Sequence, residues 1–190
     1  MINYPIKRKE HTKSKNYANL GMTLESDIDS TNIYYLNNNI AVIHKKPTPI
    51  QVVNVSYPAR NKAKITEAYY KTPSTTDYNG IYLGRYIDFD AKETNSKTSM
   101  PLKNVHNHQI EHLKMVDEHN GIAFLIVHFK QYNEYYLLPF KVLYEFWLNR
   151  NKADGRKSIP YETFRENAYL IPFNYMPRLD YLAVIKKHLF

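Results

Sequence analysis

The chain has 190 residues, of which 43% are hydrophobic and 14% aromatic, and it carries a formal net charge of +8. This length and apolar content suffice for one sizeable core, so we expect a single domain over residues 17–190. The absence of cysteine excludes disulfide bonds, thiolate metal sites and a cysteine nucleophile. The positive charge favours a polyanionic partner such as nucleic acid, although many basic proteins bind nothing acidic.

Residues 1–16 are basic and polar and show no apolar periodicity. We expect a solvated, flexible arm there, which either follows DNA phosphates or has no role. The N-terminus lacks the apolar segment of a signal peptide, and no run of 18 apolar residues could span a membrane. The sequence therefore predicts a cytoplasmic protein that does not associate with membranes.

The first structured region is expected to contain one helix and three strands. Thr23 can cap a helix over residues 24–38, and Ile40–His44 follows as a short buried strand. Ile50–Tyr57 and Lys62–Lys71 are predicted to form a hairpin that is rich in cations and aromatic rings. Cations neutralise phosphates and aromatic rings stack on unpaired bases, but lysines along a strand edge can also serve only to prevent aggregation.

The Leu83-Gly84 dipeptide separates two β-rich runs. It predicts a tight hairpin with a two-residue turn, in which the glycine supplies a positive φ angle. Counting outward from this turn places Asp77 opposite Asp90. Thr75 falls opposite Lys92 in the same register.

Side chains on the second strand of this hairpin alternate between two faces. One face carries a mostly polar set, namely Tyr86, Asp88, Asp90 and Lys92. The other face carries Ile87, Phe89, Ala91 and Glu93, and its apolar character predicts that it is the buried one.

Two directly opposed carboxylates destabilise a strand pair unless a cation compensates them. Oxygen ligands favour a hard divalent ion, so Asp77 and Asp90 predict a site for Mg²⁺, with Mn²⁺ as a possible substitute. Lys92 follows on the same face and can stabilise negative charge on a phosphate or orient a water molecule. This set suits phosphodiester hydrolysis, with Asp77, Asp90 and Lys92 as catalytic residues.

The order Thr76-Asp77, hairpin, Asp90-Ala91-Lys92 resembles the core of the PD-(D/E)xK nuclease superfamily, with threonine where the superfamily's name has proline. The wider sequence resembles the RecU family of bacterial Holliday-junction resolvases from about residue 17 to the C-terminus. The segments that carry this resemblance are Gly21-Met22-Thr23-Leu24-Glu25, Ile43-His44-Lys45-Lys46-Pro47-Thr48-Pro49, Thr75–Glu93, His108-Gln109-Ile110-Glu111-His112, Gly155-Arg156-Lys157-Ser158-Ile159-Pro160 and Pro177-Arg178-Leu179-Asp180-Tyr181.

The resemblance implies an α/β fold of the restriction-endonuclease type, in which a mixed central sheet is flanked by helices and a stalk hairpin of about residues 46–72 projects into the junction. It implies that the metal is held by Thr75, Asp77, Asp90 and Gln109. The residues expected to contact DNA are Lys45, Lys46, Arg60, Lys62, Tyr70, Arg156 and Lys157. RecU relatives usually carry glutamate at the position of Asp90, so the shorter side chain predicts a shifted metal position or an altered choice between Mg²⁺ and Mn²⁺.

The C-terminal half is expected to alternate helices and strands. Residues 95–104 read as a polar loop, and residues 106–119 as a helix with Gln109 on its core-facing side. The apolar run 121–129 predicts a central strand, and residues 134–138 an edge strand beside it. A helix over residues 142–149, a basic loop and a final helix that ends near Lys187 complete the chain. His108 and His112 share a helix face but lack a zinc motif, so a solvated or DNA-facing role is favoured.

The sequence therefore predicts a structure-selective endonuclease that resolves four-way DNA junctions by symmetric nicking during recombination and repair of DNA damage. The resemblance further implies that the protein is a homodimer associated with the nucleoid. It also implies a branch-migration helicase and a strand-exchange recombinase as partners. Two alternatives remain open at this point. One is a junction-binding protein that does not cut, and the other is a restriction-type nuclease that acts on linear duplex, because one metal core serves many substrates.

Overall fold

The computed structural model describes residues 23–59, 61–71 and 75–190. The predicted arm of residues 1–16 and the predicted DNA contact Arg60 lie outside the described residues. The central sheet has six strands in the order β1 (Val42–Lys45), β4 (Tyr78–Tyr82), β5 (Arg85–Thr94), β7 (Ile122–Phe129), β8 (Glu134–Pro139) and β10 (Tyr169–Ile171). Strands β5 and β7 are parallel and the other neighbouring pairs are antiparallel, so the sheet is mixed as predicted.

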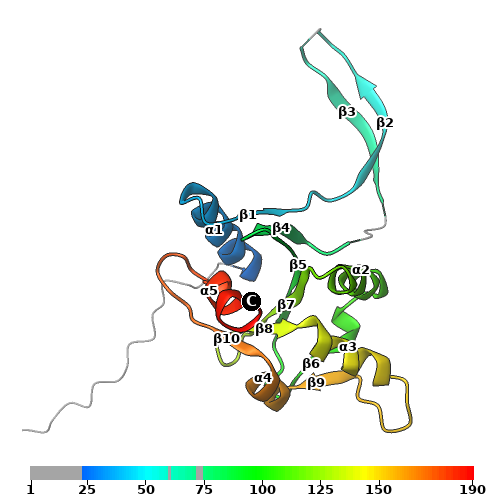
Figure 1. The fold of residues 1–190 in the computed structure, drawn as a ribbon. Helices are drawn as coiled ribbons and strands as arrows, with labels where there is room; N and C mark the ends of the chain where they lie inside the picture. The colour runs from blue at the N-terminus through cyan, green and yellow to red at the C-terminus, as the bar shows by residue number, and fades with distance from the viewer. Residues whose placement is uncertain (1–22, 60, 72–74) are drawn as a thin grey trace, which may run out of the picture.

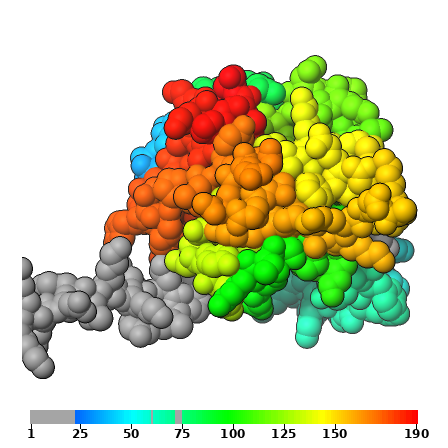
Figure 2. All heavy atoms as spheres, turned by 90° about the horizontal axis from the view of Figure 1, so that it is seen from below, coloured from blue at the N-terminus to red at the C-terminus, as the bar shows by residue number. Residues whose placement is uncertain are grey.

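Helices cover both faces of this sheet (Figure 1). One face packs against α1 (Leu24–Asn37) and α5 (Tyr181–His188). The other packs against α2 (Asn107–Glu118), α3 (Phe140–Asn149) and α4 (Tyr161–Asn167). Seen from below, the C-terminal part of the chain, coloured yellow to red, forms most of the visible surface (Figure 2). This confirms the predicted α/β class with a central mixed sheet flanked by helices.

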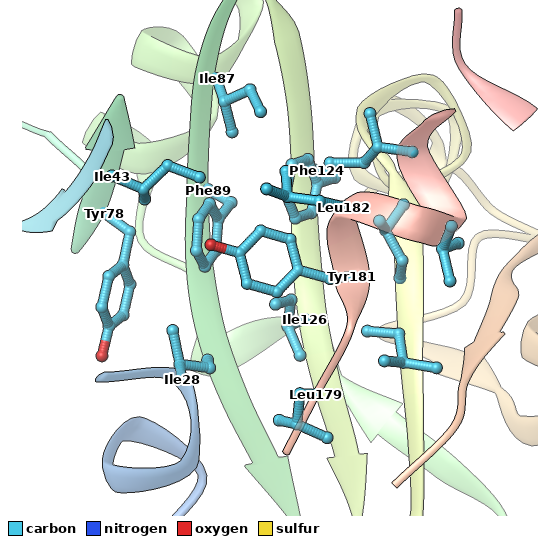
Figure 3. Packing of buried hydrophobic residues seen from close by; sticks show 14 of the residues in the cluster. Ile28, Ile43, Tyr78, Ile87, Phe89, Phe124, Ile126, Leu179, Tyr181 and Leu182 are labelled. Carbon is cyan, nitrogen blue, oxygen red and sulfur yellow. The ribbon is translucent and has the colours of Figure 1, made fainter. Parts of the chain in front are cut away.

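Aromatic stacking forms the centre of the core on the α1 face (Figure 3). The ring of Phe89 stacks on Tyr78 at 4.9 Å and on Phe124 at 4.8 Å, so β4, β5 and β7 are joined by one row of rings. Tyr181 of α5 packs over this row, with its ring centre 5.2 Å from that of Phe89. Because Phe89 is fully buried between three rings, it fixes the face of β5 that turns away from the carboxylates.

A separate two-stranded sheet, formed by β2 (Ile50–Ser56) and β3 (Lys64–Tyr70), projects from the domain (Figure 1). All seven residues of β2 are exposed, as are all but one residue of β3. The backbone N–H of Lys71 donates to the carbonyl of Pro49 and closes the base of the hairpin. We call β2, β3 and their connection the stalk, and the structure confirms this predicted feature.

The polar face of β5 is buried too, although the sequence predicted burial only for the apolar face. Asp88 and Asp90 are fully buried, as are Ile87 and Phe89 on the opposite face. The chain crosses over from β5 to the parallel strand β7 through α2, and this helix covers the carboxylate face. A carboxylate on a central strand is therefore buried even though its face is polar.

Several predicted boundaries also differ from the structure. Residues 95–104 are not only a loop, because they contain β6 (Ser99–Pro101), which pairs with β9 (Ser158–Pro160), and the 3-10 helix η2 (Leu102–Asn104). The strand predicted over residues 40–44 begins at Val42 and lies at the sheet edge, where only Ile43 is buried. Strand β8 is not an edge strand, because β10 pairs with its outer side.

Candidate active site

The hairpin of β4 and β5 has the register that the sequence predicts. Leu83 and Gly84 both adopt positive φ angles, of 47° and 78°, which is the conformation of a two-residue turn that matches strand twist. The pairing runs from Tyr82 opposite Arg85 to Tyr78 opposite Phe89. Asp77 directly precedes β4, and its carboxylate interacts with Asp90 closely enough to affect the pKa of that group.

Asp90 lies at the centre of this candidate site and is fully buried. Burial raises the pKa of its carboxyl group to about 6, Lys92 opposes this rise, and Asp77 adds to it. The ammonium nitrogen of Lys92 lies 2.6 Å from Oδ1 of Asp90 as an ion pair. The predicted catalytic residues Asp77, Asp90 and Lys92 are therefore brought together at one point, where burial and Asp77 make the charged form of Asp90 costly.

Gln109 joins α2 to this carboxylate. Its side-chain amide donates a hydrogen bond to Oδ2 of Asp90, and its side-chain oxygen accepts one from the backbone N–H of His106 at 3.0 Å. The second bond belongs to the capping box that begins α2. The amide is therefore buried with partners for both of its polar groups, and the start of α2 is fixed relative to Asp90.

Two cavities open beside the candidate site. The first has a volume of about 610 Å³ and is lined by Lys92 and Lys103, and the second has about 330 Å³ and is lined by Thr75 and Asp77. Glu25 of α1 lines both cavities, although it was not among the predicted site residues. A substrate phosphate can therefore approach Lys92 and Asp77 from the solvent.

The residues present fit a hard divalent cation. Within residues 23–59, 61–71 and 75–190, no three histidine or carboxylate side chains gather into a metal cluster. Asp90 Oδ1 is buried, and the ammonium group of Lys92 lies 2.6 Å from it as an ion pair. Two neighbouring carboxylates beside open cavities match the way Mg²⁺ is usually held by one or two carboxylates, with water and phosphate oxygens completing the shell.

A second buried carboxylate, Asp88, was not among the predicted site residues. Oδ2 lies 2.8 Å from Lys46 Nζ, 2.8 Å from the hydroxyl of Tyr86 and 2.9 Å from Nε2 of His112. Oδ1 accepts a hydrogen bond from the hydroxyl of Thr76. His112, for which a solvated or DNA-facing role was predicted, therefore contacts a buried carboxylate instead.

Glu93 lies on the face of β5 opposite to Asp90, and its carboxylate has structural partners there. Its carboxylate accepts a hydrogen bond at 3.1 Å from the backbone N–H of Leu24, in the first turn of α1, and pairs with Lys130 at 2.5 Å. His128 lies 3.6 Å from the same carboxylate. Burial opposes charge on Glu93, but these neighbours together hold its pKa below the usual value. Glu93 therefore secures α1 to β5.

The predicted DNA contacts on the stalk and at its base have different environments. Tyr70 is 84% exposed, and Lys62 is exposed beside the connection between β2 and β3. Lys45 pairs with Glu25 at 2.6 Å and remains half-exposed. Lys46 is mostly buried because its ammonium group lies on Asp88, so it is less accessible to DNA than the sequence implied.

The remaining predicted contacts, Arg156 and Lys157, are exposed in the loop between α3 and β9. This loop lies at the end of the molecule opposite to the stalk (Figure 1). Lys157 also lines a cavity of about 300 Å³ together with Trp147 and Arg150, whose guanidinium lies 3.7 Å from the indole ring centre. The structure thus places the predicted cationic contacts in two separate regions.

A turn-linked strand pair with two carboxylates and a lysine, on a mixed sheet between helices, is the arrangement of the PD-(D/E)xK class of nucleases that the sequence resembles. Residues 19–187 match the family described as RecU, Recombination protein U. The Holliday junction resolvase RecU of Bacillus cereus (strain B4264) is 54% identical over 178 residues, which cover 94% of this chain and 88% of the relative. The chain therefore belongs to the RecU family.

The Holliday junction resolvase RecU of Staphylococcus aureus (strain JH9) is 56% identical over 171 residues, covering 90% of this chain and 82% of the relative. The solved structure of Hjc, a Holliday junction resolvase from Archaeoglobus fulgidus, aligns with 70% of this chain and 86% of its own, with a TM-score of 0.40 and 8% identity. Among the described residues, no helix is long and apolar enough to cross a membrane.

Proposed function

We propose that this protein is an endonuclease that resolves four-way DNA junctions by symmetric, metal-dependent nicking. The observation that carries the proposal is the meeting of Asp77 and Asp90 beside Lys92, in a chain that is 54% identical to a Holliday junction resolvase over 94% of its length. Junctions of this kind arise in DNA recombination and in the repair of DNA damage. A protein that acts on chromosomal junctions would work at the nucleoid, in the cytoplasm.

The site would bind Mg²⁺, with Mn²⁺ as a substitute, through Asp77 and Asp90. When bound, the ion would supply an activated water and neutralise charge on the scissile phosphate. Lys92 would stabilise the developing negative charge on that phosphate, since it lies 2.6 Å from Asp90 and lines the larger cavity. Thr75 lines the second cavity beside Asp77, which supports the predicted contribution of Thr75 to metal binding.

Gln109 would support the metal through Asp90. Its oxygen already caps α2 while its amide donates to the carboxylate. A buried donor on a ligating carboxylate fixes the orientation of the ligand and is typically worth 10–100-fold in metal affinity or activity. We therefore propose that Gln109 belongs to the metal site because it orients the ligand Asp90.

The substrate would be a four-way junction held at two regions. The exposed ring of Tyr70, with Lys62 and the predicted contact Arg60, suits unpaired or splayed bases at the branch point. Lys45 at the stalk base and Arg156 and Lys157 in the distant loop would bind backbone phosphates of the arms. Lys46 would contribute its charge at the base of the stalk.

A homodimer would supply the two symmetric nicks, because a two-fold substrate suits an isologous pair of protomers. The exposed aliphatic side chains Ile50, Val52, Val53, Val55 and Ile65 on the stalk support an association there, since an isolated two-stranded hairpin is marginally stable. A branch-migration helicase and a strand-exchange recombinase are the proposed protein partners, on the family resemblance alone.

The deciding experiment compares a synthetic four-way junction with linear duplex of identical sequence, in Mg²⁺, Mn²⁺ and chelator. We expect paired nicks in the junction with either ion, no nicks with chelator, and junction binding without nicking for Asp77→Asn and Lys92→Ala. Equal cleavage of the linear duplex would indicate a restriction-type nuclease. Junction binding without nicking at any ion concentration would indicate a non-catalytic binding protein.

A further inference from the structure

Asp88 is a buried carboxylate that the proposed chemistry does not use. It lies on the same face of β5 as Asp90, two residues away, and is fully buried. Four side chains contact it, and three are hydrogen-bond donors or cations within 2.9 Å of Oδ2. A buried charge that is so completely paired is expensive to maintain, and replacing such groups by apolar residues is often neutral or stabilising. Stability alone therefore does not explain its presence.

Two of the four partners come from the two ends of the stalk. Lys46 lies between β1 and β2, where the chain leaves for the stalk, and Thr76 lies just before β4, where the chain returns. Lys46 Nζ also donates to the hydroxyl of Thr76 at 3.0 Å, and its backbone N–H donates to the carbonyl of Asp77 at 2.7 Å. Both legs of the stalk are thus joined to each other and to one carboxylate on β5.

The other two partners connect this carboxylate to the frame of the metal site. Tyr86 is on the same strand as Asp90, and its hydroxyl donates to Asp88 at 2.8 Å. His112 is on α2, one turn beyond Gln109, which donates to Asp90. The same helix therefore contacts both carboxylates, Asp88 through His112 and Asp90 through Gln109.

The stalk has little else to fix its direction. Strands β2 and β3 form a sheet of their own and pair with no other strand among the described residues. All but one of their side chains are exposed, so among residues 23–59, 61–71 and 75–190 no packed interface between these strands and the domain fixes the angle of the stalk. Within one protomer, the orientation of the stalk relative to Asp77 and Asp90 is therefore set at its base.

We propose that Asp88 is a positioning residue that clamps both legs of the stalk to the metal site, and that Lys46 is the structural cation of this clamp. This inference rests on the proposed function, in which the stalk engages the branch point while Asp77 and Asp90 act on an arm. The clamp fixes the distance between the stalk, which binds the branch point, and the carboxylates Asp77 and Asp90, which act on the arm. Displacing the reacting phosphate by about 1 Å can cost about 100-fold in rate, so the clamp also sets which phosphate is cut.

A distance measurement in free protein tests the clamp directly. The chain contains no cysteine, so Ala68→Cys on the stalk and Lys114→Cys on α2, both exposed positions, take two spin labels and no others. Labelled chains are diluted into unlabelled chains so that each pair reports one protomer. In the labelled protein without further substitutions, we expect a narrow distribution of distances between the two spin labels. After Asp88→Asn or Lys46→Met, we expect this distribution to be broadened or shifted. Lys46→Arg, which retains the cation, should keep the distribution narrow.

The matched control is Asp90→Asn, which makes the same change two residues along the same strand. It should abolish nicking and leave the distance distribution narrow. Asp88→Asn should instead slow nicking at saturating junction by about 100-fold, with the junction Kd changed little. If Asp88→Asn does not fold, Thr76→Val removes one donor of the clamp without adding volume and should also broaden the distribution.

Distributions that are unchanged in Asp88→Asn and Lys46→Met, or that are already broad in the parent protein, would overturn the clamp. Junction binding that is lost in Lys46→Met while the distance distribution stays narrow would assign Lys46 to DNA instead. The distance measurement contains no DNA, so its result does not depend on the proposed function. Failure of that function would appear separately, as an absence of nicking by the unsubstituted protein.

Discussion

The ammonium group of Lys92 lies 2.6 Å from Oδ1 of Asp90, although burial and the neighbouring Asp77 both favour the protonated form of that carboxyl group. Lys92 thus lowers a pKa that the rest of the site raises. A divalent ion that binds Asp90 would replace the proton and remove the repulsion from Asp77. Metal binding and proton release should therefore be coupled at this residue.

The first prediction concerns pH. The pKa of Asp90 is raised to about 6 from 3.8, so below pH 6 a proton competes with the metal. Because one proton must be displaced, the apparent Mg²⁺ or Mn²⁺ affinity should fall about tenfold for each pH unit below 6 and level off above it. Lys92→Met removes the cation that lowers this pKa and should move the break to higher pH. Calorimetric metal titrations from pH 5 to 8 measure both effects, and an affinity that is constant from pH 5 to 7 would refute the assignment.

The second prediction separates the two hydrogen bonds of Gln109. Gln109→Ala removes the α2 cap and the donor to Asp90, so it should cost about 1 kcal/mol of unfolding free energy from the cap and slow nicking by about 10–100-fold. Gln109→Glu keeps an acceptor for the cap but removes the donor and adds repulsion with Asp90. It should slow nicking to a similar degree. Urea denaturation with single-turnover nicking measures both, and full activity in Gln109→Ala would contradict the orienting role.

The third prediction concerns stability in mild acid. Burial lowers the pKa of His128 below 6.5, although Glu93 opposes this shift. The folded state therefore binds fewer protons than the unfolded state, and stability is lost as pH falls below about 6.5, by up to about 1.4 kcal/mol per pH unit. His128→Phe keeps the stacking on Tyr135, whose ring centre is 4.1 Å away, and removes this titration.

The titration of Asp90 has the opposite sign, since its raised pKa makes the folded state bind more protons than the unfolded state between pH 3.8 and 6. The comparison should therefore be made between His128→Phe and the unsubstituted protein, which share Asp90. Urea denaturation from pH 5 to 7.5 should show the difference in stability changing in favour of His128→Phe as pH falls. Parallel curves would show that the pKa of His128 is the same in the folded and unfolded states, which would contradict this prediction.

The fourth prediction concerns the stalk. Tyr70 is 84% exposed, so its ring is available for stacking on a base and contributes little to the core. Tyr70→Ala should weaken junction binding by about 1–3 kcal/mol, the usual value for base–aromatic stacking. Tyr70→Phe keeps the ring and serves as the matched control. Equal junction affinities for the Ala and Phe variants, measured at one salt concentration, would remove Tyr70 from the proposed DNA surface.

Local sequence patterns predicted the hairpin of β4 and β5 well. The Leu83-Gly84 turn alone set the register of β4 and β5, because a two-residue turn leaves no freedom in the pairing of the flanking strands. The helical period likewise placed Gln109 on the buried face of α2. In both cases the determining contacts lie close together in the sequence.

Contacts between distant segments were not predicted. Burial of the polar face of β5 was not predicted, because nothing local reveals that α2 covers it. Lys46 looked like a phosphate contact because its partner Asp88 is 42 residues away. Strand β10 is only three residues long, too short for a periodic pattern, so β8 was taken for an edge strand. The burial of β5, the partner of Lys46 and the position of β8 in the sheet all depend on tertiary packing, which local sequence propensity does not reveal.

The most direct test of the central claim is Mn²⁺ binding followed by electron paramagnetic resonance in the unsubstituted protein, Asp77→Asn and Asp90→Asn. If both carboxylates hold one ion, each substitution should weaken binding by at least tenfold while circular dichroism shows a folded protein. Mn²⁺ affinity that is the same in all three proteins would show that Asp77 and Asp90 do not form a metal site, and the proposed mechanism would be wrong.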